Sequence, residues 1–141
     1  MTTWMLKSEP ETYSYDQLVK DKETAWTGVR NYTARIHLNA MKKGDRCFFY
    51  HSGGPKEVVA VAEVTKPAYP DATANADPEE AKKGWVCVDI KPVATLKRAV
   101  TLAELKKHKT LSKMQLVKMS RLSVSPVTEA EAKALLALAG A

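Results

Sequence analysis

The sequence contains few residues of the types that bind metals or form disulfides. Its 141 residues include two cysteines and three histidines. Cys47 and Cys87 each lie inside an apolar segment, CFFY and WVCVDI, and neither segment has CxxC or Cys–His spacing. Zinc ligands normally occur in such motifs. We therefore expect no metal site, and we predict two buried free thiols in a reducing compartment.

The sequence also lacks a long hydrophobic run. No segment approaches the roughly 18 consecutive apolar residues of a membrane-spanning helix, and no basic region followed by an apolar core opens the chain. We therefore expect no membrane partner and a cytoplasmic location, or a nuclear one if the source is a eukaryote. The composition is 45% hydrophobic and 27% charged, which argues against a disordered or fibrous protein.

Acidic residues are fewer than basic ones. Lys and Arg number 22 against 16 Asp and Glu, which gives a formal net charge of +6. Such a surplus favours a polyanionic partner, above all nucleic acid, although many basic proteins have no such partner. We interpret the pairs Lys82-Lys83, Lys97-Arg98 and Lys106-Lys107 as solvated surface without a site role.

The hydrophobic pattern predicts about five short strands separated by helices of unequal length. Residues at capping positions mark three helix starts, Ser14, Thr101 and Thr128, each followed three residues later by Gln or Glu. Strands are expected over residues 3–8, 46–52, 58–64, 85–90 and 121–125, and a long surface loop over 66–84. The elements do not alternate as in a βαβ series. We predict an α+β protein, one domain over 1–141, with a small, bent, mixed or antiparallel sheet that is partly closed into a barrel.

The segment 26–52 contains the strongest functional signal. It combines an indole, a turn glycine, an amide and two arginines within ten residues, and it ends on a polar strand terminus. Such a mixture suits a pocket for a flat, anionic ligand such as a nucleotide. The residues concerned are Trp26, Gly28, Arg30, Asn31, Arg35, Tyr50, His51 and Ser52.

Each of these residues also has a structural interpretation. Trp26 can stack on a base or pack in the core, and we favour stacking. Arg30 and Arg35 can bind phosphate, or they can serve only surface solubility or form ion pairs with Asp45 or Glu63. Asn31 can simply cap the helix whose buried stripe is Ala34, Leu38 and Met41. Trp4 and Trp85 lie in strand patterns and are expected in the core.

The ends of the first two strands are both polar. If these strands are neighbours, the pairs Lys7-Ser8 and His51-Ser52 converge at one mouth of the barrel, although His51 can equally be a structural histidine bonded to backbone. Val29 or Leu122 could contact a methyl group on the ligand. Arg121 and Ser123 can face either solvent or the pocket.

Several blocks of the sequence resemble the EVE domain family, in family-like order and over nearly the whole chain. They are WMLKSEPETYSYDQL, WTGVRNYTARIHLNAMKKGDRCFFYHS, VVAVAEVTKPAYPDATA, WVCVDIKPV and MSRLSVSPVTEAEA. The signature W-x-G-V-R-N-Y-x-A-R followed by G-D-x-x-F-F-Y-H-S is long and specific. The resemblance implies a PUA-like pseudobarrel, related to YTH and ASCH domains, with a pocket for modified bases such as 5-methylcytosine and its oxidised forms.

The resemblance also implies a set of ligand-binding positions, contributed by four separate segments. They are Lys7, Ser8, Trp26, Gly28, Val29, Arg30, Asn31, Arg35, Tyr50, His51, Ser52, Ser120, Arg121, Leu122 and Ser123. We predict a non-catalytic binding module for modified nucleotides or modified bases in DNA or RNA. It is expected to need no cofactor and to be a monomer, with its oligomeric state left open.

Two other functions remain open from the sequence. An ASCH-like hydrolase could use Lys7, His51 and a carboxylate such as Glu9 for proton transfer, but the sequence has no nucleophile elbow and no paired carboxylates. A protein-interaction scaffold could instead use the 66–84 loop as its binding surface.

Overall fold

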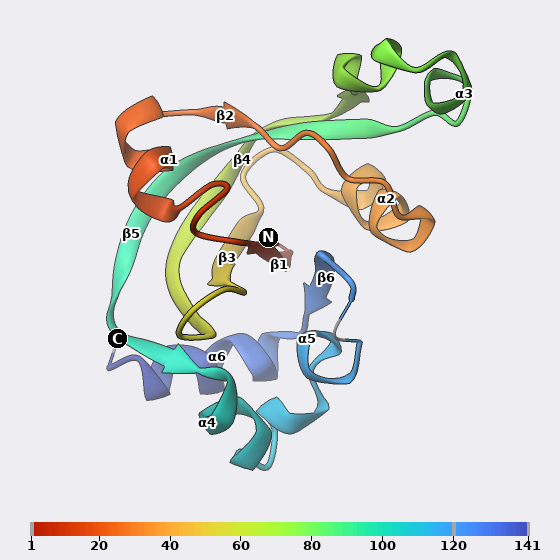
Figure 1. Ribbon diagram of the computed structural model, residues 1–141. Helices are drawn as coiled ribbons and strands as arrows, with labels where there is room; N and C mark the ends of the chain where they lie inside the picture. Colours follow the sequence, from red (N-terminus) through yellow and green to blue (C-terminus); the bar gives the residue numbers. More distant parts are fainter. Residues whose placement is uncertain (1, 120, 141) are drawn as a thin grey trace.

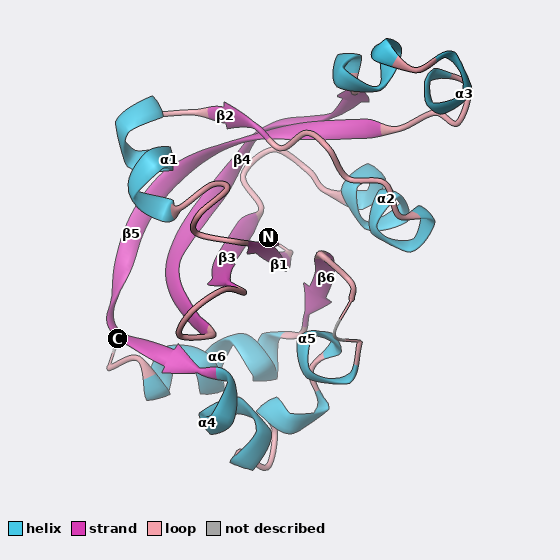
Figure 2. Ribbon diagram, viewed as in Figure 1, coloured by secondary structure: helices cyan, strands magenta, loops and turns pink. Residues whose placement is uncertain are grey.

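One curved, six-stranded sheet organises the chain in the computed structural model, which describes residues 2–119 and 121–140 (Figures 1 and 2). Its strand order is β2-β5-β4-β3-β1-β6. Neighbouring β1 and β3 run parallel, and the other neighbours run antiparallel. The strands are β1 (Thr3–Ser8), β2 (Thr24–Ala25), β3 (Arg46–His51), β4 (Glu57–Pro70), β5 (Val86–Thr101) and β6 (Val124–Val127). The fold is the predicted α+β pseudobarrel with a bent mixed sheet.

The helices begin where the capping residues predict. Side chains of Ser14, Asn31, Thr101 and Thr128 each accept a hydrogen bond from a backbone N–H of the first turn, and Thr101 and Thr128 form complete capping boxes. The α-helices are α1 (Tyr15–Asp21), α2 (Tyr32–Ala40), α3 (Pro78–Ala81), α4 (Leu102–Lys107), α5 (Gln115–Lys118) and α6 (Glu129–Leu138). The described residues also contain two 3₁₀ helices, η1 (Ala72–Ala76) and η2 (Leu111–Lys113).

Three strand predictions need correction. β4 and β5 are much longer than expected, because register shifts between them interrupt the alternating pattern while the ladder continues. Pro92, at one such shift, pairs opposite Ala62 inside the ladder. The last strand begins at Val124 rather than 121, where pairing with Leu6 of β1 starts.

The predicted surface loop over 66–84 is largely ordered secondary structure. Its first residues continue β4 to Pro70, and the remainder folds into η1 and α3 at the far end of β4 and β5 (Figure 1). Asp71 and Asp77 cap these two helices through their carboxylates. Asp71 and Asp77, inside the predicted loop, are therefore helix starts.

Two hydrophobic clusters lie on opposite faces of the sheet. Trp4 and Leu6 belong to the first, which also contains buried residues of α1 and α2, and Met5 belongs to the second, packed by α4, η2 and α6. Figure 1 shows α4, α5 and α6 together on one side of the strands. Cys47 and Cys87 are buried and free, as predicted. In the described part of the chain, no helix combines the length and apolar character needed to cross a membrane.

Candidate functional site

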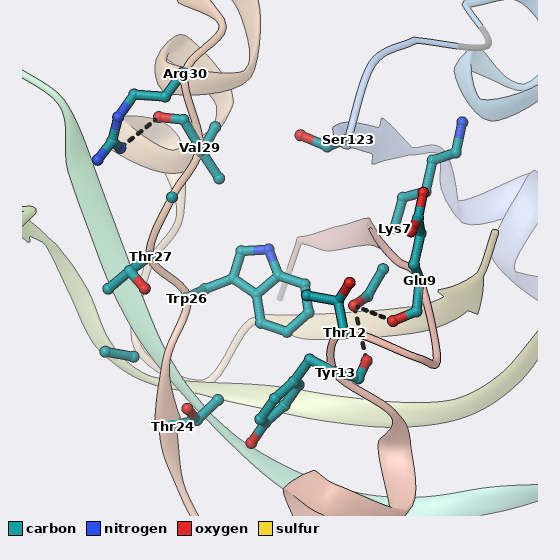
Figure 3. A pocket seen from close by; sticks show the side chains of 13 residues that line it. Lys7, Glu9, Thr12, Tyr13, Thr24, Trp26, Thr27, Val29, Arg30 and Ser123 are labelled. Carbon is teal, nitrogen blue, oxygen red and sulfur yellow. Dashed lines mark hydrogen bonds between the residues drawn. The ribbon is translucent and has the colours of Figure 1, made fainter. Parts of the chain in front are cut away.

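A cavity of about 480 Å³ opens between the end of β1, the turn that follows it and the segment from β2 to Arg30 (Figure 3). We call it the Trp26 pocket. Its volume lies within the usual range of small-molecule sites, roughly 300–1,000 Å³. Its lining residues are Lys7, Ser8, Glu9, Thr12, Tyr13, Thr24, Ala25, Trp26, Thr27, Gly28, Val29, Arg30 and Ser123.

Trp26 is both a core residue and a wall of this pocket. Only 9% of its surface is exposed, and it belongs to the first hydrophobic cluster. Its ring meets Phe49 at 5.5 Å and 83°, and Tyr13 at 6.1 Å and 84°. Its backbone N–H donates to the Val88 carbonyl. The two interpretations of Trp26 are therefore compatible, because a ring fixed by edge-to-face contacts is a preorganised surface for a ligand.

Asp71 fixes the loop that carries the pocket's basic edge. Its buried carboxylate accepts hydrogen bonds from the Gly28 backbone N–H at 2.9 Å, from Arg30 Nη1 at 3.0 Å and from the Thr73 backbone N–H at 2.9 Å. Burial raises the pKa of Asp71, but the bonds from Thr73, Gly28 and Arg30 outweigh it and hold the pKa below its usual value. Gly28 has a φ of +83°, which a residue with a Cβ rarely adopts.

The two predicted arginines have different surroundings. Arg30 lines the pocket with its side chain 30% exposed, and its charge is shared with Asp71. Arg35 lies away from the pocket, where its guanidinium carbon sits 5.0 Å from the Tyr32 ring centroid and Nη1 donates to the Lys83 carbonyl. Asp45 and Glu63, the predicted ion-pair alternatives, do not bond the arginines: they bond Trp4 Nε1 and Lys91, respectively.

Strands β1 and β3 are neighbours, as the convergence of their polar ends requires. Lys7 pairs in register with Tyr50, and Ser8 with His51. The polar groups at these strand ends line two hollows. Lys7 and Ser8 line the Trp26 pocket, and Lys7 also lines a separate hollow together with Tyr50 and Ser52.

His51 has the arrangement expected of a structural histidine. Its Nε2 accepts a hydrogen bond from the Tyr15 backbone N–H at 3.2 Å. Burial lowers the pKa of His51, although the nearby carboxylates of Glu57 and Asp16 act in the opposite direction. An acceptor nitrogen must be unprotonated, so this bond needs the neutral ring.

Most of the remaining predicted residues line another open hollow, of about 370 Å³. Asn31, Arg121 and Leu122 line it together with Thr33, Lys118 and Met119. Asn31 caps α2 by accepting from the Ala34 N–H at 2.9 Å, the structural role that its position predicted. The predicted site residue Ser120 lies outside the described residues.

Several pocket residues have no sequence pattern that predicts a site. The turn after β1 and the short β2 carry no pattern that indicates a site, and Asp71 lies in the predicted loop far along the chain. Glu9 was considered only as a hydrolase residue. The missed lining residues are Glu9, Thr12, Tyr13, Thr24, Ala25 and Thr27.

The family assignment follows from comparison with known proteins. The family model described as the EVE domain matches residues 2–138 of the 141. The chain belongs to the EVE domain family. This EVE domain is 37% identical to human thymocyte nuclear protein 1 over 163 aligned residues, which cover 96% of the chain and 72% of the relative.

Solved structures share the architecture of this EVE domain. A hypothetical protein from Leishmania major superposes with a TM-score of 0.93 at 42% identity, covering 99% of this chain and 95% of that one. The human THYN1 protein, crystallised in complex with DNA containing 5-methylcytosine, superposes with a TM-score of 0.90 at 34% identity, covering 100% and 99% of the two chains.

The EVE domain's chemistry at this site is that of a binding pocket with an aromatic wall. Hydroxyls of Ser8, Thr12 and Thr27 supply neutral donors and acceptors, and Arg30 and Lys7 supply positive charge at the edge. Within residues 2–119 and 121–140, no three His, Cys, Asp or Glu side chains group closely enough to hold a metal ion.

Proposed function

We propose that this EVE domain is a binding module that holds a modified base of DNA or RNA, or a modified nucleotide, in the Trp26 pocket without altering it. The observation that carries the proposal is the fixed indole wall of a cavity with polar and cationic groups at its edge. The similar human THYN1 protein in complex with 5-methylcytosine DNA supports the same ligand class.

In the pocket, affinity and selectivity for a modified base have different physical origins. Stacking of a base on an aromatic ring contributes about 1–3 kcal/mol, and the base must first leave its own stack. Val29, which is buried and lines the pocket, offers apolar surface to a methyl group. Apolar recognition of one methyl group is limited to about 1–3 kcal/mol, so we expect moderate preference for a methylated base.

The hydrolase alternative has weaker support. Of its three proposed proton-transfer residues, Lys7 and Glu9 line the Trp26 pocket. His51 bonds the Tyr15 backbone and is not among the lining residues. General acid–base catalysis needs each group within hydrogen-bond reach of the substrate, so a bound but unaltered ligand is favoured.

The decisive experiment compares binding of two otherwise identical fluorescent oligonucleotides, one with a single 5-methylcytosine and one with cytosine. We expect the wild-type protein to prefer the methylated strand. Trp26→Leu, which removes the aromatic face, should weaken binding by about 1–3 kcal/mol, or roughly 5- to 150-fold. Trp26→Phe keeps a ring and should retain most of the affinity.

Controls separate this result from loss of folding or from turnover. Urea unfolding of each variant establishes that the compared proteins are folded under the binding conditions. Mass spectrometry of the recovered strand should find it unchanged. Equal affinity of the wild-type protein for both strands, or a chemical change in the strand, would contradict the proposed function.

We further propose that residues 1–141 form one EVE domain that acts as a monomer inside the cell. The name of the human relative, thymocyte nuclear protein 1, favours an intracellular location. The choice between cytoplasm and nucleus depends on the source organism. Light scattering of the purified protein, alone and with its oligonucleotide, tests the monomer.

A further inference from the structure

A third cavity, of about 160 Å³, lies at the opposite face of the sheet from Trp26, and three lysines converge on it. We call it the lysine hollow. Its lining residues are Lys7, Tyr50, Ser52, Lys56, Leu102, Lys106, Leu116 and Val117. Two of these, Tyr50 and Ser52, were predicted site residues that the Trp26 pocket does not include.

The strand register and the helix that follows β5 bring these residues together. Lys7 and Tyr50 pair across parallel β1 and β3, so their side chains share one face, where Tyr50 joins the second hydrophobic cluster. The Leu102 N–H donates to the Lys56 carbonyl at 2.8 Å, which fixes the start of α4 beside the turn that carries Lys56. Lys106 lies four residues further along this helix.

The charges in the lysine hollow are of one sign. No carboxylate is among its described lining residues. Glu104, the acidic residue of α4, is held by Arg98 at 2.8 Å, and neither Lys56 nor Lys106 forms an ion pair with any described residue. Burial and the charge of Lys56 lower the pKa of Lys7. Three ammonium groups around one cavity repel each other, and a bound anion would relieve that repulsion.

The dimensions of the hollow select the size of the anion. Its volume of about 160 Å³ is below the roughly 300–1,000 Å³ of sites that enclose small organic ligands. The hollow therefore suits a group as small as a single tetrahedral oxyanion. The Ser52 and Tyr50 hydroxyls add neutral donors to the lysine ammonium groups.

We propose that the lysine hollow is a phosphate-binding site, separate from the base pocket and joined to it through Lys7, which lines both. In Figure 3 the Lys7 side chain extends away from the Trp26 indole, past the edge of the pocket. The phosphate is a backbone diester of the strand whose base occupies the Trp26 pocket, or free phosphate. Only the first of these sources rests on the proposed function.

The first experiment uses inorganic phosphate, with chloride at equal ionic strength as reference, and follows backbone amide signals by NMR. We expect saturable shifts at Ser52, Lys56, Leu102 and Val117. Lys56→Gln/Lys106→Gln should weaken this binding at least fivefold. Lys107→Gln/Lys109→Gln removes the same charge from exposed positions outside the hollow and should leave binding unchanged.

The second experiment measures oligonucleotide affinity as a function of salt for the same proteins. Loss of one phosphate contact should reduce the slope of log K against log salt by about 0.7–0.9. At low salt we expect Lys56→Gln/Lys106→Gln to bind the oligonucleotide roughly tenfold more weakly, and the control Lys107→Gln/Lys109→Gln to bind it as the wild type does. The preference for the methylated strand should be unchanged, because the base pocket is intact.

The outcomes are distinguishable. If the wild-type protein binds phosphate saturably and Lys56→Gln/Lys106→Gln still binds the oligonucleotide as the wild type does, the hollow is a site for free phosphate. If Lys56→Gln/Lys106→Gln weakens the binding of both phosphate and the oligonucleotide, the hollow binds the nucleic-acid backbone. Absent base preference with intact phosphate binding contradicts the proposed function alone. The phosphate site is refuted when no amide of the hollow shows saturable shifts and both double variants bind the oligonucleotide equally.

Discussion

At the scale of single residues, Asp71 holds together the loop that forms one edge of the Trp26 pocket. One buried carboxylate bonds the backbone of Gly28, the guanidinium of Arg30 and the backbone of Thr73. These groups belong to segments more than 40 residues apart in the chain. Hydrogen bonds that involve a charged group contribute more than neutral ones, about 1.5–3 kcal/mol each.

We predict that Asp71→Asn lowers the free energy of unfolding by about 2 kcal/mol and weakens ligand binding, because an amide lacks the charge that holds Arg30. Its NH₂ group also cannot accept the bonds that the second carboxylate oxygen accepts. Urea unfolding and oligonucleotide titration measure the two effects. The control is Asp77→Asn, which alters an exposed cap at which Asn and Asp are equivalent. Equal stability of the two variants would contradict this role.

His51 predicts a pH dependence of stability. Its folded-state pKa is below the ordinary value of about 6.5, so below that pH the unfolded chain binds more protons. The free energy of unfolding should therefore fall as pH decreases from about 6.5 through the folded-state pKa. Above about pH 8 both states are neutral at this residue, and no dependence on His51 is expected.

The matched variant for this pH effect is His51→Gln, which keeps an acceptor for the Tyr15 N–H but does not titrate. Stability of both proteins is measured by urea unfolding between about pH 5 and 7.5. We expect the wild-type curve to drop more steeply on acidification than that of His51→Gln. His37, whose pKa burial also lowers, titrates in both proteins and cancels from the comparison. Parallel curves would exclude the His51 contribution.

At the scale of elements, the helix starts were predictable and the strand lengths were not. A cap is a local arrangement, so Ser14, Asn31, Thr101 and Thr128 identify helix starts from a few neighbouring residues. The lengths of β4 and β5 depend on pairing between distant residues across several register shifts, which leave no regular alternation in either strand.

The same contrast between local and long-range features holds for the site residues. The segment around Trp26 and Arg30 could be predicted as a site from its mixture of residue types. By contrast, Tyr50, His51 and Ser52 look like one polar group in the sequence, although consecutive strand residues cannot all face one cavity. In the structure Tyr50 lines the lysine hollow, and His51 accepts a hydrogen bond from the Tyr15 backbone. Asp71 was not predictable, because its partners are far away in the chain.

The cap of α6 gives a prediction at this scale. Thr128 Oγ1 accepts from the Glu131 N–H at 3.2 Å, and Glu131 Oε1 accepts from the Thr128 N–H at 2.9 Å. Thr128→Ala removes one of these bonds and should lower the free energy of unfolding by about 1 kcal/mol. Thr110→Ala is the control, since Thr110 precedes η2 without a side-chain cap bond and should cost less than half as much. Equal losses would contradict the capping role.

At the scale of the whole molecule, the sheet separates two cavities of different character. The cavity beside the first hydrophobic cluster has an aromatic wall, and the cavity beside the second is surrounded by lysines. Lys7 lines both because it is at the end of β1, where the sheet no longer separates its two faces. In the proposed function the first cavity holds the base, and as the proposed phosphate site the second cavity binds the charge that every nucleotide carries.

This separation, with the net charge of +6, predicts different salt responses for affinity and preference. Binding of an oligonucleotide should weaken steeply between about 50 and 200 mM salt, because cationic contacts release counterions from the strand. The ratio of affinities for methylated and unmethylated strands should stay nearly constant, since both strands carry the same phosphates. Fluorescence titrations of the two strands at several salt concentrations provide both quantities. A modified nucleoside without phosphate is the control, and its weaker binding should respond little to salt. A preference that disappears with added salt would place base recognition in the charged contacts rather than in the Trp26 pocket.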